Sequence, residues 1–79
     1  MITAAQCKTA RLLLGWSIKD LSSRTRSAVE TIELFELNSP RPYKKTISKL
    51  RESLEAAWID FFTDNEGAPM ARLRKDGGP

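Results

Sequence analysis

Histidine is absent from this chain of 79 residues, and cysteine occurs once, at Cys7. A single cysteine cannot form an internal disulfide, and the inventory excludes a zinc site, a histidine-based catalytic triad and an imidazole acid–base pair. No remaining set of residues could assemble an activated nucleophile or a metal-bound water, so we expect no enzyme, no metal and no cofactor. The helical position of Cys7 favours a small core residue over a redox sensor.

Long apolar runs are also missing. No segment approaches the roughly 20 apolar residues of a transmembrane helix, and the apolar core of a signal peptide is not found. These absences predict a cytoplasmic protein without membrane contact. The chain can bury one modest hydrophobic core, is too short for a dinucleotide-binding fold or a barrel enzyme, and has a size at which dimerisation often adds stability.

Capping motifs predict where the first two helices begin. Thr3 and Gln6 stand three residues apart at the start of a helical apolar period over residues 3–14. Ser17 is placed to cap a second helix over residues 18–24. The stripe expected to be buried on the first helix consists of Cys7, Ala10, Leu13 and Leu14.

A third helix is expected over residues 28–37, and Ser27 is the only candidate for its N-cap. Asn38 and two following prolines predict a turn over residues 38–42. A fourth helix then runs from residue 43 or 46 to residue 57. The expected apolar stripes are Val29, Ile32 and Phe35 (or Leu37) on the third helix, and Ile47, Leu50, Leu54 and Ala57 (or Trp58) on the fourth.

After Trp58 the hydrophobic period changes from helical to alternating. Two alternating segments flank a stretch dense in turn formers, so we predict a β-hairpin within residues 59–75 and a disordered tail at 76–79. The predicted fold is one mostly α-helical domain over residues 1–75. Its helical part, residues 1–58, has four to five short helices that include a helix-turn-helix, and a C-terminal β-hairpin or strand comes after them.

Short motifs on the helices and on the hairpin carry a family resemblance. They are LGWS at 14–17, DL at 20–21, TI at 31–32, FE at 35–36, EAA at 55–57, Phe61, Gly67, Pro69 and RLRK at 72–75. With these motifs, which cover almost the whole chain, the protein resembles the XRE-type, lambda-repressor-like family of small bacterial and phage transcriptional regulators. The resemblance implies a helix-turn-helix protein that acts as a homodimer on double-stranded operator DNA.

The resemblance also implies roles for individual residues, because the third helix of this family enters the major groove. The implied base-facing residues are Ala28, Val29, Glu30, Glu33 and Leu34, with Ile18 at the start of the second helix. The implied phosphate contacts are Ser17, Arg26, Arg41, Lys44 and Lys45. The family pairs a glutamate at the position of Glu36 with an arginine of the first helix, which implies an ion pair between Glu36 and Arg11.

The third helix departs from the family pattern, because residues 28–37 contain three glutamates and no lysine or arginine. Carboxylates near phosphate oppose docking to DNA. Glu30 and Glu33 fit a neutral surface, a protein-facing surface, or groove contacts that accept from cytosine amines. The alternative function is therefore a degenerate helix-turn-helix module (an antiactivator, antirepressor or accessory regulator). Such a module would bind a partner transcription factor through Val29, Glu30, Glu33 and Leu34.

Apolar side chains near the hairpin exceed what one small core can bury. The expected surface for a second copy or another partner consists of Trp58, Ile59, Phe61, Phe62 and Leu73. The basic cluster between residues 41 and 51 has two interpretations, which are a solvated helix face and a phosphate clamp.

Overall fold

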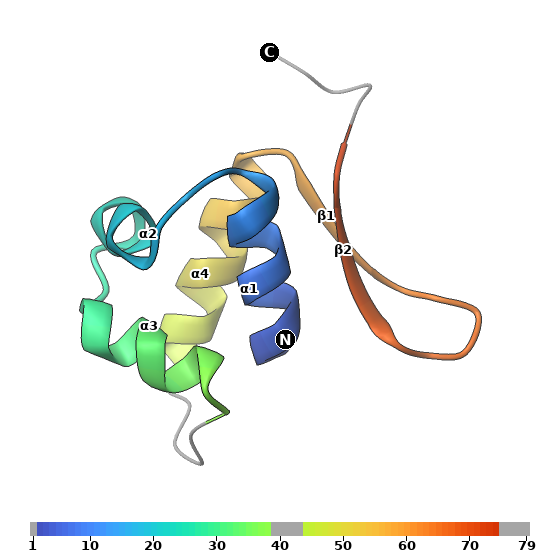
Figure 1. Ribbon diagram of the computed structural model, residues 1–79, viewed down its shortest axis with the longest axis horizontal. Coiled ribbons are helices and arrows are strands. Elements are labelled where there is room, and N and C mark those ends of the chain that lie inside the picture. The colour runs from blue at the N-terminus through green and yellow to red at the C-terminus, as the bar shows by residue number, and fades with distance from the viewer. Residues whose placement is uncertain (1, 39–43, 75–79) are drawn as a thin grey trace.

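The computed structural model describes residues 2–38 and 44–74. It has four helices followed by an antiparallel two-stranded hairpin, so the predicted fold class is confirmed (Figure 1). The elements are α1 (Ala4–Leu13), α2 (Ile18–Thr25), α3 (Val29–Glu36), α4 (Lys44–Ala56), β1 (Ile59–Thr63) and β2 (Pro69–Leu73). Most of the turn expected after Asn38, and the expected tail, lie outside the described residues.

Both predicted N-caps are present. The Thr3 hydroxyl accepts from the Gln6 N–H at 3.1 Å, and Gln6 Oε1 accepts from the Thr3 N–H at 2.9 Å. Ser17 and Asp20 make the same reciprocal pair at the start of α2. Each pair satisfies N–H groups that have no partner within their helix, which is why α1 and α2 begin where the sequence predicts.

The turn between α2 and α3 consists of Arg26, Ser27 and Ala28. Arg26 has left-handed backbone angles, with a φ of 56°. The prediction that Ser27 caps α3 is wrong, because Ala28 occupies the N-cap position and its methyl group offers no acceptor. The Ser27 carbonyl instead accepts a hydrogen bond from the Ser22 hydroxyl, which ties the turn back to α2.

The core joins all four helices to the first strand. Its buried apolar side chains are Ile2, Cys7, Ala10, Leu21, Ile32, Ile47, Leu50, Leu54 and Ile59. The aromatic rings of Trp16, Phe35 and Phe61 pack against this cluster from its edges. The predicted stripe of α4 is confirmed at Ile47, Leu50 and Leu54, and Cys7 is a fully buried core residue as predicted.

Some predicted core positions are exposed instead. Leu13 is 44% exposed because it lies about 120° around α1 from Cys7, beyond the stripe that α4 and α3 cover. Leu37 is 76% exposed because it lies about 140° around the axis of α3 from Ile32. Val29 is also exposed, since it lies at the first residue of α3, and α3 packs against α1 and α2 only along the side that carries Ile32.

The hairpin docks on α1. β1 and β2 pair in a register that places Ile59 opposite Leu73, and Asp64 Oδ1 closes the turn by accepting from two backbone N–H groups at 2.8 Å each. The Gln6 side chain donates to the Met70 carbonyl at 2.9 Å, which links the first turn of α1 to β2. The hairpin is therefore part of the same packed unit as the helices.

α1 lies between the hairpin on one side and α3 with α4 on the other (Figure 1). The hairpin and α3 consequently occupy opposite sides of the molecule. No helix within residues 2–38 and 44–74 is long and apolar enough to cross a membrane.

Candidate nucleic-acid interface

One side of α3 is free of contacts with the core, and we call it the α3 face. Its side chains fall within about 140° of arc around the helix axis and are Val29, Glu30, Glu33, Leu34 and Leu37. All of them are exposed, Val29 at 39% and Leu34 at 52%. Ala28 is exposed next to this face, so the predicted base-facing residues of the third helix are all accessible.

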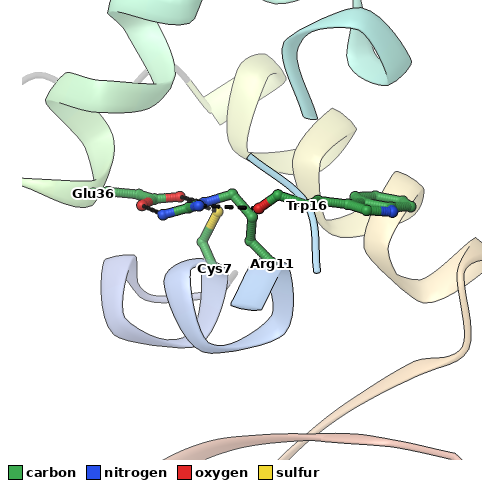
Figure 2. A network of polar contacts seen from close by, with 4 residues as sticks. All are labelled: Cys7, Arg11, Trp16 and Glu36. Atoms are coloured by element: carbon green, nitrogen blue, oxygen red, sulfur yellow. Dashed lines mark hydrogen bonds and ion pairs between the residues drawn. The ribbon is translucent and has the colours of Figure 1, made fainter. Parts of the chain in front are cut away.

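An ion pair with α1, on the side of α3 that packs against the core, fixes the orientation of α3 (Figure 2). Arg11 Nη2 lies 2.8 Å from Glu36 Oε1, and Arg11 Nε donates to Glu36 Oε2 at 3.0 Å. Arg11 Nη1 also donates to the Trp16 carbonyl at 3.1 Å, which adds the loop between α1 and α2. The two side chains are only 10% and 6% exposed, and the hydrogen bond to Glu36 raises the pKa of Arg11. The predicted Arg11–Glu36 pair is thus present and is a structural clamp.

Cys7 lies against the same clamp. Its thiol donates to Glu36 Oε2 at 3.6 Å (Figure 2). Burial and the negative charge of Glu36 raise the pKa of Cys7 from 9.0 to about 12. Because the thiolate is the reactive form, this thiol is inert at neutral pH.

Exposed cations precede α3 and begin the helix that follows it. Arg26 is exposed in the turn that precedes α3, and Lys44 and Lys45 are exposed in the first turn of α4. Lys44 comes six residues after Asn38 in the chain. Their Cα atoms are therefore at most about 20 Å apart. Arg41, the remaining basic residue of the predicted phosphate set, lies outside the described residues.

Ser17, also predicted to contact phosphate, is committed to capping α2. Its hydroxyl oxygen accepts from the Asp20 N–H at 3.0 Å, and its own N–H donates to Asp20 Oδ2 at 2.9 Å. The hydrogen bond from the Ser17 N–H, and after it a hydrogen bond with the Ser17 side chain, lower the pKa of the Asp20 carboxyl. A contact of Ser17 with phosphate stays a prediction.

A shallow pocket of about 200 Å³ lies beside the α3 face, between α1, α2 and α3. Its lining residues are Lys8, Arg11, Ile18, Glu33, Glu36 and Leu37. Ile18, which the resemblance places near DNA, is half-buried and packs against the core from the start of α2. Lys8 contributes a positive charge to the pocket that Glu33 also lines, whereas Glu30 lies outside it.

The predicted partner surface at the hairpin is only partly available. Ile59 is 1% exposed and belongs to the core, and Phe61 packs against that core. The inclusion of these two residues was wrong, because the alternation along β1 turns them toward the helices. Phe62 lies on the opposite side of β1, Trp58 is half-buried directly before β1, and Leu73, opposite Ile59, is 44% exposed.

Arginines cover the remaining hairpin aromatics. The guanidinium of Arg72 lies 4.8 Å from the ring centroid of Phe62, and that of Arg74 lies 5.2 Å from Trp58. Arg72 also pairs with Asp60 at 3.0 Å. Sequence reasoning missed these contacts, because only the strand register brings residues distant along the chain to the same face.

Comparison with known proteins does not assign this chain to a family. No model of a protein family matches this chain, and no curated protein matches it. Within the part of the chain that the structure describes, no three cysteine, aspartate or glutamate side chains are grouped so as to hold a metal ion.

Proposed function

We propose that this protein is a small DNA-binding transcriptional regulator of the helix-turn-helix type that acts as a dimer on operator DNA. In such proteins the second helix of the pair lies in the major groove, and the first crosses the phosphate backbone. Here α2 and α3 would form the pair. α3 would enter the groove, while Arg26, Lys44, Lys45 and Arg41 would contact phosphates.

The observation that carries this proposal is the presentation of α3. Its inner side is held by Ile32 and by the Arg11–Glu36 clamp, its outer side is free, and cations lie near both ends. A rigid, outward-facing helix with flanking positive charge is what major-groove docking requires. The resemblance in the LGWS, TI and FE motifs points to the same function.

The carboxylates of the α3 face set the expected strength of binding. A carboxylate about 6 Å from a phosphate opposes docking by roughly 0.7–3 kcal/mol at effective dielectric constants of 20–80. Glu30 and Glu33 would therefore offset a large part of what the flanking cations contribute. We expect modest affinity that is measurable at low salt and falls steeply as salt rises.

A fluorescence titration of labelled duplex DNA at about 50 and about 200 mM salt tests the proposal. The wild-type protein should bind at low salt. Lys44→Ala should weaken binding to all duplexes and reduce the slope of log affinity against log salt by about one.

Arg51→Ala is the matched control. Arg51 is an exposed cation of the same helix, about 10 Å further along and paired with Glu55, so its loss removes the same charge away from the α3 end. If the two substitutions weakened DNA binding equally, the loss would come from the lower net charge of the protein and not from a phosphate contact of Lys44. Absence of binding to any duplex at low salt, up to tens of micromolar protein, would refute the proposal.

A second candidate function is docking to a partner regulator through the α3 face. The observation that favours it is the alternation of exposed Val29, Leu34 and Leu37 with Glu30 and Glu33, which suits a basic and apolar protein surface. Substitution of Glu30 and Glu33 by lysine separates the two functions. It should raise DNA affinity if the α3 face meets DNA, and it should abolish capture of a protein partner if the α3 face meets protein.

A further inference from the structure

The α3 face carries no side chain that can donate a hydrogen bond, and this restricts which bases it could read. Three of its members are aliphatic, and Glu30 and Glu33 are carboxylates, which only accept when ionised. Ala28, next to the face, adds a methyl group. The restriction matters only if α3 lies in the major groove, so a base preference inferred from it rests on the proposed function.

Major-groove chemistry then selects one base for a carboxylate. Guanine presents two acceptors and thymine presents one, and all of these repel a carboxylate. Adenine offers an amine donor, but its N7 acceptor lies beside that amine. Cytosine alone presents its N4 amine without an acceptor on the same base, so a carboxylate favours cytosine.

The aliphatic side chains of the α3 face have one apolar group to contact in the major groove. The C5 methyl group of thymine is the apolar group that the major groove presents, and alanine- and threonine-type methyl groups commonly contact it. Val29 and Leu34 lie on either side of Glu30 on the α3 face. A carboxylate between two aliphatic side chains thus matches a cytosine with thymine near it.

Glu30 is better placed for this role than Glu33. It lies in the first turn of α3, the end that contacts base edges in helix-turn-helix complexes. Glu33 instead lines the pocket that Lys8 also lines. Within residues 2–38 and 44–74, Glu30 takes part in no ion pair, so its carboxylate has no described cation to satisfy it.

We infer that α3 reads a pyrimidine-rich strand, with Glu30 accepting a hydrogen bond from cytosine N4 and with Val29 and Leu34 in contact with thymine methyl groups. This readout is opposite in chemistry to the common arginine–guanine contact. It yields specificity at low affinity, because the same carboxylate that recognises cytosine is repelled by the other bases and by phosphate.

Selection of bound duplexes from a random pool, followed by titration of the selected site, tests the inference. The wild-type protein should enrich cytosine and thymine on one strand. Glu30→Gln should shift the preference at one position from cytosine to adenine, by roughly tenfold, because glutamine pairs with adenine N6 and N7. Uracil in place of thymine deletes only the methyl group and should weaken binding about fourfold at a contacted position.

Glu52→Gln provides the matched control. Glu52 is exposed on α4, so its substitution changes the net charge equally without touching α3, and base preference should not change. Binding without cytosine enrichment, or a preference that Glu30→Gln leaves unchanged, would overturn the readout while the proposed function stands. No binding to any duplex in the pool would overturn both.

Discussion

Glu36 belongs to α3, but its carboxylate is held by Arg11 of α1 and approached by the thiol of Cys7. A buried ion pair is costly to desolvate and is tolerated where its geometry is good and its remaining hydrogen bonds are made. Both conditions hold here, since the contact is two-pronged and Arg11 also bonds the Trp16 carbonyl. The clamp therefore specifies how α3 sits on α1.

Loss of one clamp partner should cost much stability. We expect Glu36→Gln to lower the free energy of unfolding by about 3 kcal/mol, because the buried guanidinium of Arg11 loses its counter-charge. Urea denaturation measures this difference. Glu55→Gln, which breaks the exposed Arg51–Glu55 pair, should cost no more than about 0.5 kcal/mol. Equal losses of unfolding free energy in the two variants would show that the buried Arg11–Glu36 pair contributes no more stability than the exposed Arg51–Glu55 pair.

Cys7 gives the fold a sensitivity to alkaline pH. Its pKa is raised from 9.0 to about 12 in the folded state, so folding favours the protonated thiol. This contribution is fully present below pH 9.0 and is lost as the pH rises toward about 12. The free energy of unfolding, plotted against pH across this window, should fall more steeply for wild type than for Cys7→Ala. Parallel plots for the two proteins would contradict the raised pKa of Cys7.

Arg26 is the residue of the α2–α3 turn that carries backbone strain. Its φ of 56° places a long side chain in the left-handed region, which glycine adopts freely. The strain is local, because it occurs where α2 must end and the chain must reverse toward α3. The position therefore combines a structural cost with an exposed charge near the α3 face.

Substitution at Arg26 should separate these two roles. Arg26→Gly should raise the free energy of unfolding by about 1 kcal/mol and weaken DNA binding, because the strain and a phosphate contact are removed together. Arg26→Asn removes the same charge and tolerates the left-handed region, so it should weaken DNA binding equally with a smaller gain in stability. Undiminished DNA binding in both variants would remove Arg26 from the phosphate contacts.

At the level of elements, local signals predicted most of the fold. The caps at Thr3 and Ser17 and the period change after Trp58 depend on residues close in sequence, and the structure agrees with them. Burial depends on neighbours that are distant in sequence, and that is where prediction failed. Leu13 was predicted to be buried and Ile59 to be exposed, because no local pattern tells which distant elements cover a residue. The Gln6–Met70 contact, which links the hairpin to α1, has no sequence signature either.

The candidate site was predictable to a similar extent. The Arg11–Glu36 pair and the exposure of the α3 face were predictable from the family resemblance. The arginines that cover Trp58 and Phe62 were not, because they require the register of β1 on β2. The capping role of Ser17 was predictable from its spacing to Asp20, and its contact with phosphate stays a prediction.

The whole molecule separates two surfaces, with the α3 face on one side of α1 and the hairpin on the other. If the proposed dimer forms through the hairpin, both α3 faces would be free for DNA. The exposed apolar residue on the outer face of the hairpin is Met70, which lies opposite Phe62, whereas Leu73 lies opposite Ile59 on the side that faces the helices.

A charge at Met70 should separate the subunits. We expect Met70→Asp to sediment as a monomer at concentrations where wild type is a dimer, because an interface core does not accept an unpaired carboxylate. Leu34→Asp places the same charge on the α3 face and should leave the dimer intact. Dimers in both variants, or a monomeric wild type, would exclude the hairpin as the interface.

The central claim is that the α3 face meets DNA, and amide chemical-shift mapping tests it most directly. Addition of a duplex to isotope-labelled protein at low salt should perturb Arg26, the residues of α3 and the first turn of α4. The amides of β1 and β2 should stay unchanged. Perturbations confined to the hairpin, or none at saturating duplex, would contradict the claim.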